Sequence, residues 1–213
     1  PGGTIFNADL GTLKKIESFD DPYFRDNVAE SIAHSWYDGD WSRHPWEEDT
    51  VPAYSEYDYN GRYSWVKAPR FDGKPMQVGP LSQVLVGFAS GHEPTVRWAK
   101  WMLSTAGAVA GANLGPAVLH STLGRHAARA IRCAVLAELA LKHWDLLVAN
   151  IASGDTDIFT PWEYPAGEQQ GFGFHEAPRG VLSHWVVVND GKIKNYQCVV
   201  PSTWNAGPRD GND

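Results

Sequence analysis

Residues 171–210 have the sequence GFGFHEAPRGVLSHWVVVNDGKIKNYQCVVPSTWNAGPRD, and this stretch decides the fold of the C-terminal part of the chain. Two runs rich in β-branched and aromatic residues, 181–188 and 192–200, flank the sequence Asn-Asp-Gly. Such a pair of runs is a strong signal for a β-hairpin, because a tight I′ turn requires positive φ at both central residues. We therefore predict a hairpin with Asp190 and Gly191 at its turn.

The turn also sets the register of this hairpin. With Asp190-Gly191 as the two turn residues, Trp185 faces Tyr196 and His184 faces Gln197. Both pairs are favourable neighbours on the surface of a pleated sheet. The same register, continued to the open end of the hairpin, places Arg179 opposite Ser202.

These two residues, Arg179 and Ser202, each follow a proline, in Pro178-Arg179 and Pro201-Ser202. Proline has no backbone N–H and a fixed φ, so both strands should stop pairing at these points. The predicted hairpin then holds a guanidinium group and a hydroxyl group at the same end. All four residues are candidate site residues.

The composition limits the class of protein. A chain of 213 residues with 43% hydrophobic content can bury a substantial core, and we expect residues 1–213 to form a single partial domain. The formal charge of −7 argues against the basic surface that nucleic-acid binding requires. No apolar run reaches the roughly eighteen residues of a membrane-spanning helix. Two cysteines far apart in sequence do not define a disulfide framework.

The sequence predicts a helix that starts within 20–25 and continues over 27–36, and apolar periodicity predicts further helices over 84–90, 94–110 and 121–151. The last of these has apolar residues on more than one face, so we expect it to be buried within a bundle. Residues 37–76 are rich in Gly, Pro, Trp, Tyr and Asp and predict a long irregular loop. The predicted fold class is α+β and mostly helical: a helical bundle with long irregular loops and a C-terminal β-hairpin.

Several motifs resemble the large subunit of nickel-iron hydrogenases. In that family EAPRG recurs, as does VVPTTWN followed by PRD, and this chain has EAPRG at 176–180 and VVPSTWNAGPRD at 199–210. The resemblance continues in the family's order through HSWY (34–37), HPWE (44–47), YSWVKAPRFDGKPMQVGPL (63–81) and STLGRHAARA (121–130). It covers nearly the whole chain. It implies the catalytic subunit of an uptake-type hydrogenase, which cleaves H₂ heterolytically and reversibly to protons and electrons.

The cysteine pattern departs from this family. Its members hold nickel and iron with two Cys-x-x-Cys pairs, one near each end of the subunit, whereas this chain contains only Cys133 and Cys198. We interpret the chain as an internal fragment of the subunit that lacks both metal-ligating ends. The resemblance then implies a nickel-iron centre, with cyanide and carbon monoxide on the iron, whose cysteine ligands lie outside these residues.

The resemblance also implies roles for individual residues. Arg179 would overhang the open site between the metals, where a fixed cation stabilises developing charge, and Pro178 would shape the same wall. Its high pKa makes arginine a poor base. Ser202, after Pro201, would donate a hydrogen bond to a cyanide ligand of the iron. The backbone carbonyl of Cys198 would bind magnesium, a hard cation that prefers oxygen.

Taken without the resemblance, the same residues have ordinary explanations. Arg179 would pair with a surface carboxylate, and Ser202 would cap a turn. Cys198 would be a small buried hydrophobic residue. The eight histidines do not support a zinc site, because no His-x-x-x-His spacing occurs.

The partners implied by the resemblance are an iron–sulfur small subunit, H₂ as substrate and a membrane cytochrome b. The same resemblance implies a place on the periplasmic side of the cytoplasmic membrane, reached by export with the small subunit. Two alternatives remain open at this point. One is the quinone-site subunit of respiratory complex I, which is related in fold but lacks the metal centre. The other is a carbohydrate-binding module, suggested by the ten tryptophans.

Overall fold

The computed structural model describes residues 2–163 and 165–212. Contacts divide the chain into two compact units, which we call unit 1 (1–15 and 80–163) and unit 2 (16–79 and 164–213). Helices comprise 38% of the residues and strands 23%, which confirms the α+β, mostly helical class. The single partial domain over 1–213 stays a prediction.

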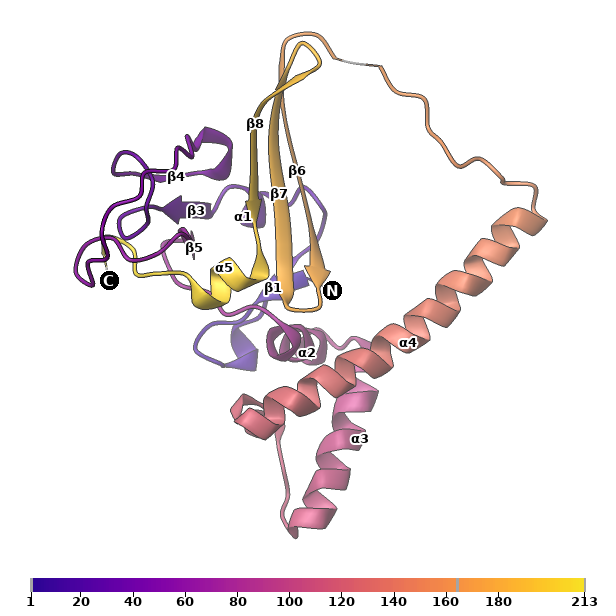
Figure 1. The fold of residues 1–213 in the computed structure, drawn as a ribbon. Coiled ribbons are helices and arrows are strands. Elements are labelled where there is room, and N and C mark those ends of the chain that lie inside the picture. Colours follow the sequence, from indigo (N-terminus) through magenta and orange to yellow (C-terminus); the bar gives the residue numbers. More distant parts are fainter. Residues whose placement is uncertain (1, 164, 213) are drawn as a thin grey trace. The chain divides into compact units, whose positions relative to one another are not determined.

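Unit 1 is helical. Its principal elements are α2 (Pro80–Ala89), α3 (Glu93–Ala110), the 3₁₀ helix η3 (Pro116–His120) and α4 (Thr122–Ala152). A short strand β1 (Gly2–Thr4), the 3₁₀ helix η1 (Leu10–Thr12) and β2 (Lys14–Ile16) precede them, and β1 pairs with β2. In Figure 1, α4 crosses both α2 and α3. The core between these helices contains Leu81, Val84, Ala99, Leu103, Leu119 and Ile131.

Local signals explain where the helices of unit 1 begin and end. The hydroxyl oxygen of Ser121 accepts a hydrogen bond of 3.0 Å from the backbone N–H of Gly124 and so caps the start of α4. Gly111, with φ of 65°, ends α3 in the left-handed conformation that favours glycine. The helices predicted over 84–90, 94–110 and 121–151 are confirmed, and α2 begins four residues earlier than expected.

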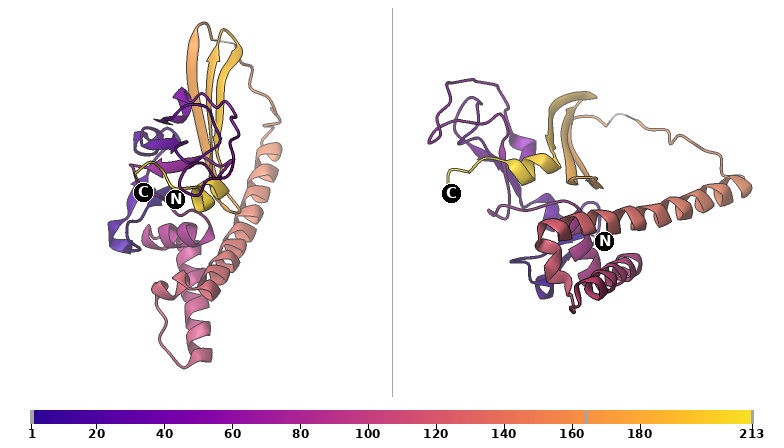
Figure 2. Two further views of the ribbon diagram at one scale, coloured as in Figure 1. Left: turned by 60° about the vertical axis from the view of Figure 1, so that its left-hand side comes forward. Right: turned by 60° about the horizontal axis from the view of Figure 1, so that its bottom comes forward.

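The expected burial of the longest helix is wrong for its second half. The buried residues of α4 end at Val135, and Leu141, Trp144 and Leu147 are all exposed. Helix α4 has 31 residues, whereas α2 and α3 have 10 and 18. Figure 2 shows the second half of α4 extending beyond both neighbours. No helix in the described residues is long and apolar enough to span a lipid bilayer.

Unit 2 contains the predicted hairpin as part of a three-stranded antiparallel sheet. The strands are β6 (Glu168–Ala177), β7 (Gly180–Asn189) and β8 (Lys192–Val199), in the order β6-β7-β8. A short helix, α5 (Pro201–Ala206), follows β8. In Figure 1, α5 lies at the end of the sheet where β6 turns into β7. The hairpin is therefore β7–β8, and β6 was not foreseen.

The predicted register is correct at the turn and wrong beyond it. Asp190 and Gly191 have φ values of 47° and 76°, as the turn requires, and Asn189 pairs with Lys192. A β-bulge then inserts one extra residue into β8, so that Trp185 pairs with Gln197 and not with Tyr196, and His184 pairs with Cys198.

A shift of one residue moves every later side chain to the other face of the sheet. Asn195 and Gln197 consequently share the buried face with Trp185. The amide nitrogen of Asn195 donates to the carbonyl oxygens of Trp46 and Glu48, at 3.0 and 3.1 Å. These bonds can form only on the buried face, and they explain why the bulged register is stable.

A second sheet in unit 2 corrects the N-terminal part of the prediction. It contains β4 (Ser42–Arg43), β3 (Val28–Ser31) and β5 (Ala68–Phe71), in the order β4-β3-β5. The helix expected to start within 20–25 is present as α1 (Pro22–Arg25). Its expected continuation over 27–36 is wrong, because residues 28–31 pair as a strand with β5. The predicted loop over 37–76 contains β4, the 3₁₀ helix η2 (Pro45–Glu47) and β5.

The core of unit 2 is aromatic. The indole of Trp185, on β7, is 1% exposed and stacks on Phe172 with ring centroids 4.7 Å apart. Its ring also meets Trp46 edge to face at 5.3 Å. The core residues are Phe24, Val28, Phe71, Val78, Val181, Trp185, Val199 and Trp204. Residues of both β7 and α5 pack in this core, so the core supports the end of the sheet where β6 turns into β7 and α5 lies.

Candidate functional site

The first group of candidate residues lies where β6 turns into β7. Pro178 and Arg179 form a two-residue turn, and Ala177 pairs with Gly180 across it. Both turn residues are exposed. Arg179 is therefore presented at the tip of a hairpin, and strand pairing ends on either side of Pro178 as predicted.

The second group lies at the start of α5. Strand β8 ends at Val199, and Pro201 and Ser202 are the first two residues of the helix. Pro201 is buried and Ser202 is exposed. The last ladder pair of the hairpin is Ser183 with Val199, so the predicted alignment of Arg179 opposite Ser202 is not part of the sheet. Arg179 directly precedes β7 and Ser202 lies shortly after β8, so in an antiparallel pair both residues lie at the same end of the two strands.

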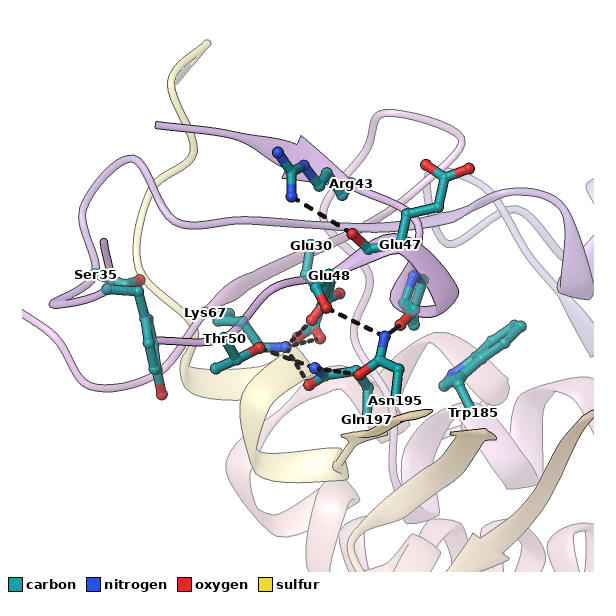
Figure 3. Close-up of polar contacts among 12 residues, drawn as sticks. Glu30, Ser35, Arg43, Glu47, Glu48, Thr50, Lys67, Trp185, Asn195 and Gln197 are labelled. Carbon is teal, nitrogen blue, oxygen red and sulfur yellow. Dashed lines mark hydrogen bonds and ion pairs between the residues drawn. The ribbon is translucent and has the colours of Figure 1, made fainter. Parts of the chain in front are cut away.

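A buried cluster of charged and polar side chains was not predicted. The ammonium nitrogen of Lys67 lies 2.7 Å from Oε2 of Glu30 and forms a second ion pair with Glu48. It also donates to Oε1 of Gln197 at 3.2 Å, while the amide of Gln197 donates to Thr50 Oγ1 at 2.9 Å. Figure 3 shows these groups converging from β3, β8 and the segments around Glu48 and Lys67.

Two carboxylates share one ammonium group in this cluster, and both are withdrawn from water. Burial, followed by repulsion from Glu30, raises the pKa of Glu48 to about 8. Burial lowers the pKa of Lys67, but the two neighbouring carboxylates outweigh it and the pKa is raised overall. Among the described residues, Glu30 Oε1 and Glu48 Oε1 have no hydrogen-bond partner. The cluster therefore has spare acceptor capacity for a proton or a hydrated cation.

The bulge in β8 determines which side chains of this strand face the buried cluster and which face away from it. Gln197 points into the cluster, so the side chain of its neighbour Cys198 must point to the opposite face of the sheet. There the thiol is exposed and lies 3.2 Å from Nδ1 of His184, which also contacts the hydroxyl of Tyr196. Cys198 is thus not a buried hydrophobic residue in this structure, and its backbone adjoins the acidic cluster.

The sequence does not reveal this cluster, because its members lie far apart along the chain, at positions 30, 48, 67 and 197. One signal was present. Lys67 lies in the sequence Trp-Val-Lys-Ala-Pro, where an isolated lysine among apolar residues indicates a buried and paired charge.

The described side chains do not form a transition-metal site by themselves. Within residues 2–163 and 165–212, no group of three or more His, Cys, Asp or Glu side chains is placed to hold a metal ion. Cys133 lies on α4 in unit 1, and Cys198 lies on β8 in unit 2.

These observations agree with the comparison to known proteins. The chain belongs to the nickel-dependent hydrogenase family, whose model matches residues 1–213. It is 46% identical to the hydrogenase-2 large chain of Escherichia coli over 214 residues, a match that covers 100% of this chain. It is 38% identical to the uptake hydrogenase large subunit of Bradyrhizobium diazoefficiens over 236 residues, covering 99% of this chain.

Solved structures agree with the sequence relatives. The reduced, active form of the nickel-iron-selenium hydrogenase from Desulfomicrobium baculatum superposes with a TM-score of 0.67 and 28% identity, covering 95% of this chain and 38% of that one. The chain also spans only 38% of the Escherichia coli relative and 37% of the Bradyrhizobium relative. These matches support the hydrogenase interpretation and not the complex I alternative.

Proposed function

We propose that this chain is part of the catalytic large subunit of an uptake-type nickel-iron hydrogenase, which cleaves H₂ reversibly to protons and electrons. The proposal rests above all on the Pro178-Arg179 turn. A paired and core-anchored sheet presents one guanidinium group there, at the end where Ser202 also lies. Membership of the nickel-dependent hydrogenase family supports the same activity.

When bound, the nickel-iron centre supplies the redox-active metals at which H₂ is cleaved. Its cysteine ligands lie outside these residues. Arg179 would place its guanidinium group beside this centre. Its fixed positive charge stabilises negative charge that develops next to it. Pro178 restricts the backbone before it, and the Ser202 hydroxyl would donate a hydrogen bond to a cyanide ligand of the iron.

The test is Arg179→Lys in the complete enzyme. Lysine keeps the positive charge but loses the planar fork that holds a fixed orientation. We expect nickel, iron and subunit assembly to stay nearly intact while turnover falls by about 10²-fold, the usual cost of losing one preorganised electrostatic group. Metal content and the rate of hydrogen oxidation are measured on one preparation. A rate near wild type would make Arg179 part of the scaffold, and loss of metal together with the rate would assign it to assembly.

We also propose a magnesium ion at the backbone carbonyl of Cys198. The donor set fits a hard cation, because the adjoining cluster offers oxygen atoms, and Oε1 of Glu30 and Oε1 of Glu48 have no hydrogen-bond partner among the described residues. The thiol of Cys198 takes no part. Magnesium content of the complete enzyme should therefore be unchanged in Cys198→Ala and reduced in Glu30→Gln.

The electron-transfer partner is an iron–sulfur small subunit, and a membrane cytochrome b accepts the electrons further on. The enzyme would lie on the periplasmic side of the cytoplasmic membrane, exported together with the small subunit. The resemblance to uptake hydrogenases supports this arrangement, as does a relative named as an uptake hydrogenase large subunit. Co-purification of the two subunits, followed by fractionation of periplasm and cytoplasm, tests it.

A further inference from the structure

The side chain of Asn205, on α5, contacts the backbone of the Arg179 turn. Oδ1 of Asn205 accepts a hydrogen bond of 3.0 Å from the backbone N–H of Val78. Nδ2 of the same amide donates to the carbonyl oxygen of Arg179 over 3.5 Å. The first bond fixes which way the amide points, because Oδ1 can only accept. The first bond therefore orients Nδ2, the donor of the longer second bond, toward the carbonyl oxygen of Arg179.

Two glycines allow the turn to approach this segment closely. Gly79 has φ of 128°, and a Cβ atom there would lie 3.1 Å from the Arg179 carbonyl oxygen. Gly180 has φ of 130°, and a Cβ atom there would lie 2.5 Å from Cγ2 of Val78. Segments 78–79 and 179–180 thus pack closely: the backbone of Gly79 lies against the Arg179 carbonyl, and the side chain of Val78 fills the space beside Gly180.

The residues that hold the Asn205 side chain in place, Val78 and Trp204, belong to the packed core of unit 2. Val78 is 8% exposed and its neighbour in the core, Trp204, is 7% exposed. Trp204 directly precedes Asn205 on α5, so the helix is anchored in the unit 2 core. Arg179 itself is exposed at the tip of a two-residue turn. A fixed amide that contacts its carbonyl restricts the one part of the hairpin that strand pairing does not hold.

We propose that Asn205 is a positioning residue for Arg179, locking the turn to the 78–79 segment and to α5. This inference rests on the proposed function, in which the Arg179 guanidinium acts beside the metals. Displacing a catalytic group by about 1 Å costs roughly 10²-fold in rate. Helix α5 also carries Ser202, so one amide sets the spacing between the two predicted site side chains.

The experiment uses the complete, metal-loaded enzyme with two variants and one control. Asn205→Ala removes both contacts. Asn205→Asp is nearly isosteric and keeps the acceptor for Val78, but it replaces the donor with an oxygen that repels the Arg179 carbonyl. Asn60→Asp introduces the same charge change at an exposed loop position of unit 2. Backbone hydrogen–deuterium exchange at 78 and 177–181, metal content, kcat and KM for H₂ are measured for each.

We expect exchange at Val78 to accelerate in Asn205→Ala only, and exchange in the turn to accelerate in both Asn205 variants. Turnover should fall about tenfold with KM for H₂ nearly unchanged, since a misplaced group loses transition-state stabilisation alone. Metal content should match wild type in Asn205→Asp, and Asn60→Asp should match wild type in every measurement. The inference would be wrong if the Asn205 variants showed the same hydrogen–deuterium exchange at 177–181 as Asn60→Asp. It would also be wrong if exchange there accelerated while kcat stayed at the wild-type value.

Arg179→Lys, alone and combined with Asn205→Asp, separates this inference from the proposed function. If Asn205 acts through Arg179, the loss in the double variant is smaller than the product of the two single losses. Multiplicative losses would show that Asn205 acts elsewhere, and so would reject the inference while leaving the proposed function standing. If Arg179→Lys retains wild-type turnover, the proposed role of Arg179 fails, and a catalytic positioning role for Asn205 fails with it.

Discussion

The ammonium nitrogen of Lys67 lies 2.7 Å from Oε2 of Glu30, and the same nitrogen pairs with Glu48, so one buried cation serves two buried carboxylates. The side chain of Lys67 is 10% exposed, and those of both glutamates are fully buried. Such a cluster is stable only if its net charge is small, because each unpaired buried charge loses its hydration. A proton on one carboxyl group achieves this, in agreement with the pKa of Glu48, which burial and repulsion from Glu30 raise to about 8.

The first prediction is a pH dependence of stability that depends on Glu48. Its pKa is about 8 in the folded chain and 4.5 when unfolded, so between these values the folded state binds one proton more. This contribution is fully present below 4.5, declines as the pH rises and is lost above about 8. The expected slope is a fall of up to ~1.4 kcal/mol in the free energy of unfolding per pH unit.

Glu48→Gln keeps the shape of the side chain and cannot ionise, so it should remove this slope. Urea unfolding of wild type and variant at several pH values from 5 to 8 makes the comparison, and the difference isolates Glu48 from other titrating groups. Parallel curves for the two proteins would show that the carboxyl group is ionised throughout this range.

The second prediction concerns the cation itself. Lys67→Met keeps most of the volume of the side chain but leaves the remaining carboxylate of the pair buried without a counter-charge, so the free energy of unfolding should fall by ~3–5 kcal/mol. Lys194→Met is the matched control, because its ion pair with Glu168 is on the surface and should contribute less than ~1 kcal/mol. Equal losses in urea unfolding would mean that burial of the cluster does not govern its energetics.

The third prediction separates the hydroxyl of Ser202 from the fold. Ser202 is exposed on α5, so Ser202→Ala should change the free energy of unfolding by less than ~0.5 kcal/mol. If the hydroxyl donates to a ligand of the iron, the infrared stretching bands of the cyanide ligands should shift in the complete enzyme. Ser202→Thr retains the hydroxyl and should restore the wild-type bands. Identical spectra for Ala and wild type would leave Ser202 a helix residue without a role at the centre.

The hairpin shows which features a sequence can reveal. The Asp190-Gly191 turn depends on φ preferences of two adjacent residues, so it was predictable from them alone. The bulge is different, because it follows from contacts of Asn195 with Trp46 and Glu48, which are 149 and 147 positions away. Strand register near a turn is a local property, whereas register far from the turn depends on what packs against each face.

The same distinction explains the other errors. Val28 and Ile32 have helical spacing, yet β5 supplies backbone partners for residues 28–31 and the segment becomes β3. Tertiary pairing outweighs a short periodic pattern of this kind. Glu30 illustrates the limit for the site, because nothing near it in sequence indicates that it pairs with Lys67. The motif resemblance located Arg179 and Ser202, but it carried no information about the buried cluster beside Cys198.

The last prediction is that residues 1–213 alone hold no stoichiometric nickel and produce no hydrogen. Nickel in a thiolate site requires several converging sulfur ligands. The chain has two cysteines, one on α4 and one on β8, and no described side chains converge as a metal site. The purified chain is loaded with nickel, dialysed against a chelator and assayed for bound metal and hydrogen evolution, with Cys198→Ala as the control for binding at the exposed thiol. Nickel retained at one per chain in wild type and lost in the variant would show that the Cys198 thiol binds nickel without the missing cysteines, contrary to this prediction.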